Sequence, residues 1–205
     1  MRWTTSPPEP GAEGESSNSP DSLPKSGYPR KDIAVSPEPN PIVVLEGPDF
    51  AGKSTAISAL VNRFDALVWA NGQPDPVVNL NLDYLDQVVR AREAKRMVVF
   101  DRLHIGELIY GPLYRQGSTL NPKGLATIEA ALLGAGAIKL HVDLDDEELL
   151  KRFRGTRGDA LVKHEYELLR IAHSYRDLLG DNGTIPGWRS VNSQEVEAVV
   201  SEVLA

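Results

Sequence analysis

Residues 41–55 read PIVVLEGPDFAGKST, a short apolar run that passes into a loop bounded by two glycines. The run is rich in β-branched residues, which favour a strand. After the loop, apolar residues recur at the spacing of an amphipathic helix, at Ile57, Leu60, Val61 and Phe64. Strand, glycine-bounded loop and helix follow one another in the order that a phosphate-binding loop requires.

The loop itself has the spacing Gly-x-x-x-x-Gly-Lys-Ser, beginning at Gly47. Gly47 and Gly52 let the backbone curl so that successive N–H groups converge on phosphate oxygens, and the helix N-terminus adds partial positive charge. We expect Lys53 to reach the β- and γ-phosphates of ATP, Ser54 to bind Mg²⁺ and Thr55 to line the same nucleotide site. The alternative is a chance match in an ordinary strand-turn-helix.

The rest of the chain alternates strand and helix patterns. Further strands are expected at residues 66–70, 97–100 and 137–143, with a short fifth strand at 188–191, and residues 97–100 form a fully apolar run. Helical patterns cover residues 80–94, 123–134 and 162–179, and a last helix is expected from Ser193. This alternation predicts an α/β fold of three layers, the P-loop NTPase architecture, with a five-stranded parallel sheet flanked by helices.

Two helical segments carry finer expectations. The apolar face of the helix over 80–94 is expected to hold Leu82, Leu85, Val88 and Val89. The segment 103–116 is expected to be interrupted near Gly111-Pro112, because proline lacks the N–H of a continuing helix.

The third strand delivers Asp101 and Arg102 to its carboxyl end. In a parallel sheet, ligands bind outside these ends, so this pair is expected beside the phosphate loop. Asp101 there would hold Mg²⁺ through water, and Arg102 would neutralise the phosphate that receives the transferred group. A surface ion pair at a strand end is the alternative.

A basic segment follows the fourth strand and contains Arg152, Arg154 and Arg157 around two glycines. Such a segment suits a lid that closes over ATP and stabilises the transferring phosphoryl group. The phosphate loop has no arginine, so Arg154 or Arg157 is expected to supply that charge. The alternative is a solvated surface run.

Composition separates a tail from a single folded domain. Residues 1–40 are dominated by Pro, Ser, Gly and Glu, so we expect a disordered tail there. Residues 41–205 are expected to form a single P-loop kinase domain. The formal charge of −7 argues against a broad duplex-binding surface, since such surfaces are usually basic. The chain has no cysteine, which excludes disulfides and a cysteine nucleophile.

No apolar stretch approaches membrane-spanning length, and residues 1–40 lack a signal pattern. We therefore expect a cytoplasmic protein, located in the host cytoplasm if the source is a virus, with no membrane partner.

The sequence from Leu45 to Thr55 resembles the Glu-Gly-x-Asp-Gly-x-Gly-Lys-Ser-Thr loop of the thymidylate kinase family, and Asp101-Arg102 resembles its Asp-Arg-Tyr motif. Residues 149–179 are similar to the family's arginine-bearing lid and the helix after it. The resemblance implies transfer of the ATP γ-phosphoryl group to a nucleoside monophosphate. It also implies that Asp49 lies near the acceptor sugar hydroxyl and Arg102 at the acceptor phosphate.

The sequence departs from the family on the acceptor side. Phe50 stands where the family usually has glycine, and residues 71–74 read NGQP in place of its Arg-Glu-Pro-Gly segment. Tyr110 falls where the family has an aromatic residue near the base, while Tyr114 and Arg115 could stack on a base and pair with a phosphate. Tyr110 and Tyr114 are also spaced as a packed helix face would be.

The function expected from these features is an ATP- and Mg²⁺-dependent phosphotransferase acting on a pyrimidine deoxynucleotide, with a dTMP-type monophosphate favoured. One alternative is a phage-type kinase that phosphorylates 5-hydroxymethyluracil within DNA, and a second is a nucleotide-binding switch NTPase. The expected partners are a nucleotide substrate, with DNA and a second copy of the chain, as a homodimer, as further candidates.

Overall fold

The computed structural model describes residues 40–75, 77–115, 117–156 and 161–205. Residues 1–39 of the expected tail lie outside the described residues. The described part contains a single sheet in which every pairing is parallel, with the strand order β2-β3-β1-β4-β5. The strands are β1 (Ile42–Glu46), β2 (Leu67–Ala70), β3 (Val98–Asp101), β4 (Ile138–Val142) and β5 (Arg189–Val191).

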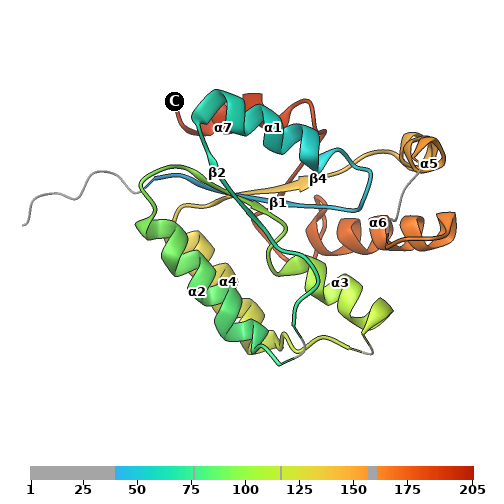
Figure 1. The fold of residues 1–205 in the computed structure, drawn as a ribbon, viewed down its shortest axis with the longest axis horizontal. Helices are drawn as coiled ribbons and strands as arrows, with labels where there is room; N and C mark the ends of the chain where they lie inside the picture. Colours follow the sequence, from blue (N-terminus) through green and yellow to red (C-terminus); the bar gives the residue numbers. More distant parts are fainter. Residues whose placement is uncertain (1–39, 76, 116, 157–160) are drawn as a thin grey trace, which may run out of the picture. The chain divides into compact units, whose positions relative to one another are not determined.

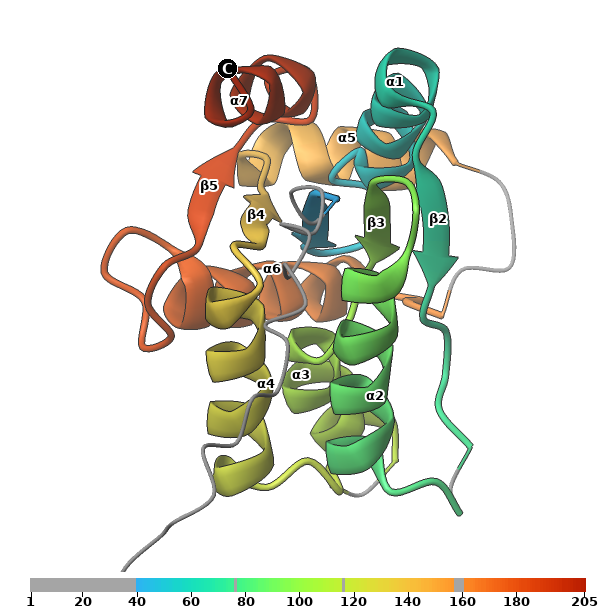
Figure 2. The same ribbon diagram turned by 90° about the vertical axis from the view of Figure 1, so that its left-hand side faces the viewer.

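Helices cover both faces of the sheet, which confirms the three-layer α/β fold (Figures 1 and 2). α1 and α7 pack on one face, α2 and α4 pack on the other, and α3, α5 and α6 share a further apolar cluster. The helices are α1 (Lys53–Phe64), α2 (Leu80–Glu93), α3 (Ile105–Tyr114), α4 (Pro122–Gly134), α5 (Asp146–Gly155), α6 (Glu165–Leu179) and α7 (Val196–Val203).

The central strand β1 is buried on both sides, which explains the unbroken apolar run Ile42–Leu45 that precedes its terminal Glu46. Val43 and Leu45 belong to the cluster formed with α1 and α7, whereas Ile42 and Val44 belong to the cluster formed with α2 and α4. Alternate side chains of a strand point to opposite faces, so each residue of this run contributes to one of two cores. β1 therefore forms the middle of the sheet, and the glycine loop follows directly from its carboxyl end.

The register of the sheet brings the two predicted motifs together. Leu45 of β1 pairs with Asp101 of β3, so both strands end at the same edge. The backbone N–H of Arg102 donates to the carbonyl of Leu45 at 3.0 Å, which ties the Asp-Arg pair to the strand that enters the loop. This juxtaposition is the one that the sequence predicts.

The expected apolar face of α2 is correct only in part. Val88 is buried and Leu85 is partly buried, whereas Leu82 and Val89 are exposed. The buried face also contains Leu80, Tyr84 and Ala91. α2 carries two apolar stripes, and packing against α4 and the sheet selects the stripe that contains the tyrosine.

α3 is not interrupted at Gly111-Pro112 but continues to Tyr114. Pro112 lies in the last turn, where the loss of one N–H donor is tolerated because Ile105 and Ile109 anchor the preceding turns in the cluster shared with α6. Among the described residues, no helix combines the length and the apolar character needed to cross a bilayer.

Candidate functional site

The loop between β1 and α1 has the backbone of an anion cradle. Gly47 (φ 148°) and Gly52 (φ 100°) both have positive φ. A Cβ on Gly47 would lie 2.3 Å from the carbonyl oxygen of Val142, and one on Gly52 would lie 2.6 Å from Oγ of Ser193. No acidic residue occupies the first turn of α1, so its amides present uncompensated positive charge. Both glycines are thus required by geometry.

Lys53 is buried under this loop. Its ammonium donates hydrogen bonds to the carbonyl oxygens of Gly47 (2.9 Å) and Pro48 (2.7 Å). Burial, assisted by the nearby charge of Arg102, lowers the pKa of Lys53 from 10.5 to about 8. An ammonium held only by carbonyl oxygens has much to gain from a phosphate anion, so the side chain suits a nucleotide-binding role.

Asp101 ends β3 beside Lys53. Its Oδ1 atom is buried and has no hydrogen-bond partner among the described residues. Asp101 and Ser54 line one cavity of about 740 Å³, here called the loop cavity, together with Gly52, Lys53, Thr55, Arg102, Arg152 and Ser193. A buried carboxylate oxygen and a hydroxyl facing the same space fit Mg²⁺, which keeps several waters and borrows ligands from phosphates. Within the described ranges no cluster of three metal-binding side chains forms an all-protein cage.

Arg102 links the loop cavity to a second cavity. Its guanidinium forms an ion pair with Asp49 and lies 5.4 Å above the ring centre of Tyr110. Its backbone is in the left-handed region (φ 62°), and its carbonyl accepts a 3.0 Å hydrogen bond from Nδ2 of Asn71. Side chain and backbone are therefore both held in place, which is the preorganisation expected at a charge-stabilising site.

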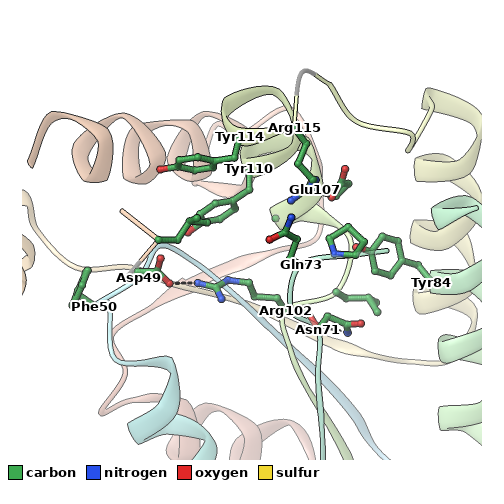
Figure 3. A pocket seen from close by; sticks show the side chains of 15 residues that line it. Asp49, Phe50, Asn71, Gln73, Tyr84, Arg102, Glu107, Tyr110, Tyr114 and Arg115 are labelled. Atoms are coloured by element: carbon green, nitrogen blue, oxygen red, sulfur yellow. Dashed lines mark hydrogen bonds and ion pairs between the residues drawn. The ribbon is translucent and has the colours of Figure 1, made fainter. Parts of the chain in front are cut away.

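The second cavity, here called the aromatic cavity, has a volume of about 410 Å³ (Figure 3). Tyr110 and Tyr114 stack with ring centres 6.1 Å apart, and their buried hydroxyls have no hydrogen-bond partner among the described residues. Arg115 forms an ion pair with Glu107. These residues line the cavity with Asp49, Phe50, Asn71, Gln73, Tyr84 and Arg102. The structure thus brings together all five residues predicted to bind a substrate.

The three arginines of the basic segment have different surroundings. Arg152 lines the loop cavity, and its Nη1 donates to the carbonyl oxygen of Phe50 at 3.3 Å. Arg154 forms a two-bond ion pair with Glu165 at 2.7 Å and is not among the described residues that line either cavity. Arg157 lies outside the described residues. The arginine found at the phosphate loop is therefore one to which the sequence assigned no role.

Glu46 is a second residue that the sequence reasoning missed. Its side chain is fully buried, and Oε1 accepts the backbone N–H groups of Leu103 (2.8 Å) and Ile105 (3.1 Å). Oε2 accepts the hydroxyl hydrogen of Tyr175 at 3.1 Å. Glu46 thereby fastens the turn that carries Arg102 to β1 and α6. An acid at the end of a wholly apolar strand was the available signal, because a buried carboxylate needs a partner.

Phe50 adopts the left-handed conformation (φ 68°). The thymidylate kinase family, which this loop resembles in sequence, usually has glycine at that position. Its ring packs edge-to-face on Phe153 of α5, with ring centres 5.4 Å apart. The phosphate loop and the basic segment are thus joined by an aromatic contact and by the Arg152 hydrogen bond.

Comparison by sequence finds no matching family model and no matching curated protein. Comparison by structure finds the YorR protein of Bacillus subtilis, solved in complex with phosphorylated GDP, with 20% identity and a TM-score of 0.63 over 80% of this chain and 95% of that one. Polyphosphate kinase 2 of Arthrobacter aurescens TC1 has 14% identity and a TM-score of 0.51 over 82% of this chain and 66% of that one.

A deoxyadenosine kinase of M. mycoides, solved with dCMP and dCDP, has 12% identity and a TM-score of 0.51 over 80% of this chain and 98% of that one. At these identities the likeness concerns the fold alone. The chain shares the three-layer fold of these nucleotide-binding and kinase structures.

Proposed function

We propose that this protein is an ATP- and Mg²⁺-dependent phosphotransferase that moves the γ-phosphoryl group of ATP to a pyrimidine deoxynucleotide, with a dTMP-type monophosphate as the acceptor. One observation carries the proposal: the loop cavity and the aromatic cavity adjoin, and Asp49, Phe50 and Arg102 line both. A donor site and an acceptor site that share their boundary residues allow direct transfer.

On the donor side, the amides of the glycine loop and the ammonium of Lys53 would hold the β- and γ-phosphates. Ser54 would bind the metal directly and Asp101 would bind it through water. The metal would neutralise charge that develops on the transferring group. The protein's own part is to align the phosphates and to exclude water from them.

On the acceptor side, Arg102 would exchange its ion pair with Asp49 for the phosphate of the acceptor. Asp49 would then be released to accept a hydrogen bond from a sugar hydroxyl. The stacked rings of Tyr110 and Tyr114 offer an aromatic wall to the nucleoside. Both cations lining the aromatic cavity are paired with carboxylates, which gives little net charge for a DNA backbone and favours a free nucleotide.

Arg152 is the best-placed described arginine for the transferring group. Both arginines have a carboxylate partner, Glu148 for Arg152 and Glu165 for Arg154, but only Arg152 lies at the loop cavity. The roles expected for Arg154 and Arg157 stay predictions. Substituting Arg152 with alanine should lower kcat at least about tenfold, because the phosphate loop supplies no arginine of its own.

A labelling experiment tests the proposal. The protein is incubated with ATP labelled at the γ-phosphate and with dTMP, with DNA that contains 5-hydroxymethyluracil, or with no acceptor. Label in the product dTDP supports the proposed acceptor, and label only in the polymer replaces it with the DNA alternative. Hydrolysis at the same rate in all three reactions would instead support the switch NTPase. Lys53→Ala, prepared in the same way, controls for contaminating kinases and should transfer no label.

A further inference from the structure

A second ion pair lies in the aromatic cavity, away from the phosphate loop. Asp49 and Arg102 line both cavities, whereas Glu107 and Arg115 line only the aromatic one. Figure 3 shows Glu107 and Arg115 on the side of the cavity opposite to Phe50. If phosphoryl transfer takes place at Asp49 and Arg102, as proposed above, the far end of the acceptor faces Glu107 and Arg115.

This second pair is largely removed from solvent, with side-chain exposures of 3% for Glu107 and 20% for Arg115. Glu107 as a whole is 5% exposed, and burial raises the pKa of its carboxyl group although Arg115 and Ser118 oppose the rise. Removing two charges from water is costly, and an apolar pair would often be as stable. The helix nevertheless makes room for the carboxylate, since a Cβ on Gly111 would lie 2.8 Å from Oε1 of Glu107.

Glu107 and Arg115 together offer an accepting group beside a donating group. An ionised carboxylate only accepts hydrogen bonds, and a guanidinium only donates them. The complementary ligand edge is therefore an N–H donor next to an acceptor. A carbonyl oxygen has two lone pairs and can accept two bonds from the guanidinium fork, whereas a ring nitrogen has one.

We infer that Glu107 and Arg115 determine the base specificity of the acceptor site and select bases whose outer edge carries a carbonyl beside a ring N–H. Glu107 accepts the ring N–H, and Arg115 donates to the carbonyl oxygen. Thymine, uracil and guanine have this lactam edge; cytosine and adenine have an amino group beside a bare ring nitrogen. The inference rests on the proposed function for its orientation of the ligand, and it assigns the choice of base to Glu107 of α3 and to Arg115, the residue directly after that helix.

The test compares matched ligands by calorimetric binding to the complete chain. dUMP and dCMP differ only at the edge in question, whereas dGMP and dAMP differ at the same edge and also in the 2-amino group of guanine. dUMP should bind at least about tenfold more tightly than dCMP, because a bidentate base contact discriminates by that order. Equal binding within the dUMP/dCMP pair, or no binding of any monophosphate at millimolar concentration, overturns the inference.

Two protein variants assign the preference to the pair. Glu107→Gln should lower the ratio of dUMP to dCMP affinity, because the amide can turn its NH₂ group to the bare ring nitrogen of cytosine, while Arg115 still disfavours the amino group beside it. Asp86→Asn, which alters an exposed ion pair with Arg90 on α2, is the matched control and should keep the ratio. A ratio that survives Glu107→Gln unchanged contradicts the assignment.

The binding measurement also separates this inference from the proposed function. Selective binding of lactam monophosphates without label transfer would retain the inference and reject the kinase. Label transfer to dCMP and dAMP as readily as to dUMP and dGMP would retain the kinase and reject the inference.

Discussion

At the scale of single residues, Lys53 carries an unfavourable charge that the nucleotide is expected to compensate. Its pKa is lowered from 10.5 to about 8 mainly by burial, so the folded state binds the proton less tightly than the unfolded state. Between these two pKa values the unfolded chain holds more protons, and stability therefore rises with pH. Over the whole range between the two pKa values, the free energy of unfolding should rise by about 3 kcal/mol.

We therefore expect the free energy of unfolding to rise between pH 8 and pH 10 in the wild-type protein and to rise less in Lys53→Met. The variant should also be the more stable of the two at pH 7, although it transfers no phosphate. Urea denaturation across this pH range measures both effects. Parallel curves for the two proteins would show that the ammonium is not destabilised by burial.

Phe50 gives a second residue-level prediction, because its backbone has φ 68°. Only glycine adopts this conformation without strain, and other residues lose roughly 1 kcal/mol. Phe50→Gly and Phe50→Ala both lose the contact with Phe153, so their difference isolates the backbone. Phe50→Gly should be the more stable by about 1 kcal/mol in thermal or urea unfolding. A more stable alanine variant would mean that the loop relaxes to another conformation.

Individual site residues were predictable where neighbours in sequence carry the signal. Lys53 and Ser54 follow from the glycine spacing, and Asp101 and Arg102 follow from their position at the end of an apolar strand. The sequence did not single out Arg152 from Arg154 and Arg157. The orientation of α5 about its own axis decides which arginine faces the phosphate loop, and the spacing of charges along the sequence does not determine that orientation.

At the scale of elements, the side chain of Glu46 accepts two backbone N–H groups of the turn from β3 into α3. Glu46→Ala would leave the N–H groups of Leu103 and Ile105 without their acceptor, at about 1–3 kcal/mol for each buried group. Glu46→Gln keeps an oxygen for both N–H groups, and its NH₂ group can donate to the hydroxyl of Tyr175.

The alanine variant should lose stability and raise the KM for the acceptor, because Arg102 precedes the loosened turn, whereas the glutamine variant should remain close to wild type in both. Chemical denaturation and initial-rate kinetics provide the two readouts. A kinetic defect of equal size in both variants would point instead to a need for the negative charge.

The order of elements was predictable, and the buried face of α2 was not. The sequence predicts strands at all five positions, and β1 and β3 carry the clearest signal because buried parallel strands appear as continuous apolar runs. β5, with the sequence Arg-Ser-Val, is only partly buried and carries the weakest signal. In α2 two apolar stripes compete, and the stripe that is buried depends on α4, which lies far along the chain. The interruption expected at Pro112 is absent for a related reason, because tertiary packing keeps α3 helical up to Tyr114.

At the scale of the whole molecule, the sheet buries a histidine that resists protonation. His141 on β4 is fully buried, and its Nδ1 lies 3.1 Å from Oγ of Ser190 on β5. Burial lowers its pKa from 6.5 to about 4, with Asp143 opposing the shift and the charges of Arg176 and Lys53 adding to it. The unfolded chain therefore takes up a proton between these values while the folded chain does not.

The protein should accordingly lose up to about 3 kcal/mol of stability as the pH falls from 6.5 to 4, on top of the effect of its carboxylates. His141→Gln should flatten that part of the profile. Fluorescence-monitored urea unfolding at half-unit pH steps tests this, and an identical slope in the variant would assign the acid sensitivity to other groups.

The sheet order β2-β3-β1-β4-β5 likewise belongs to the whole molecule. The sequence predicts which runs become strands, but the choice of neighbours depends on crossover connections and long-range packing. That order places the ends of β1 and β3 side by side and so creates the border between the two cavities.

The ion pair between Asp49 and Arg102 has a consequence for the resting protein. An incoming anion must displace a carboxylate that is already tethered at the guanidinium, so every anion competes with a built-in rival. A nucleotide meets this competition with its base and sugar as well as its phosphate, whereas orthophosphate has no such additional grip. If the acceptor binds at Arg102 as proposed, we therefore expect orthophosphate to compete only weakly with a complete nucleotide for this guanidinium.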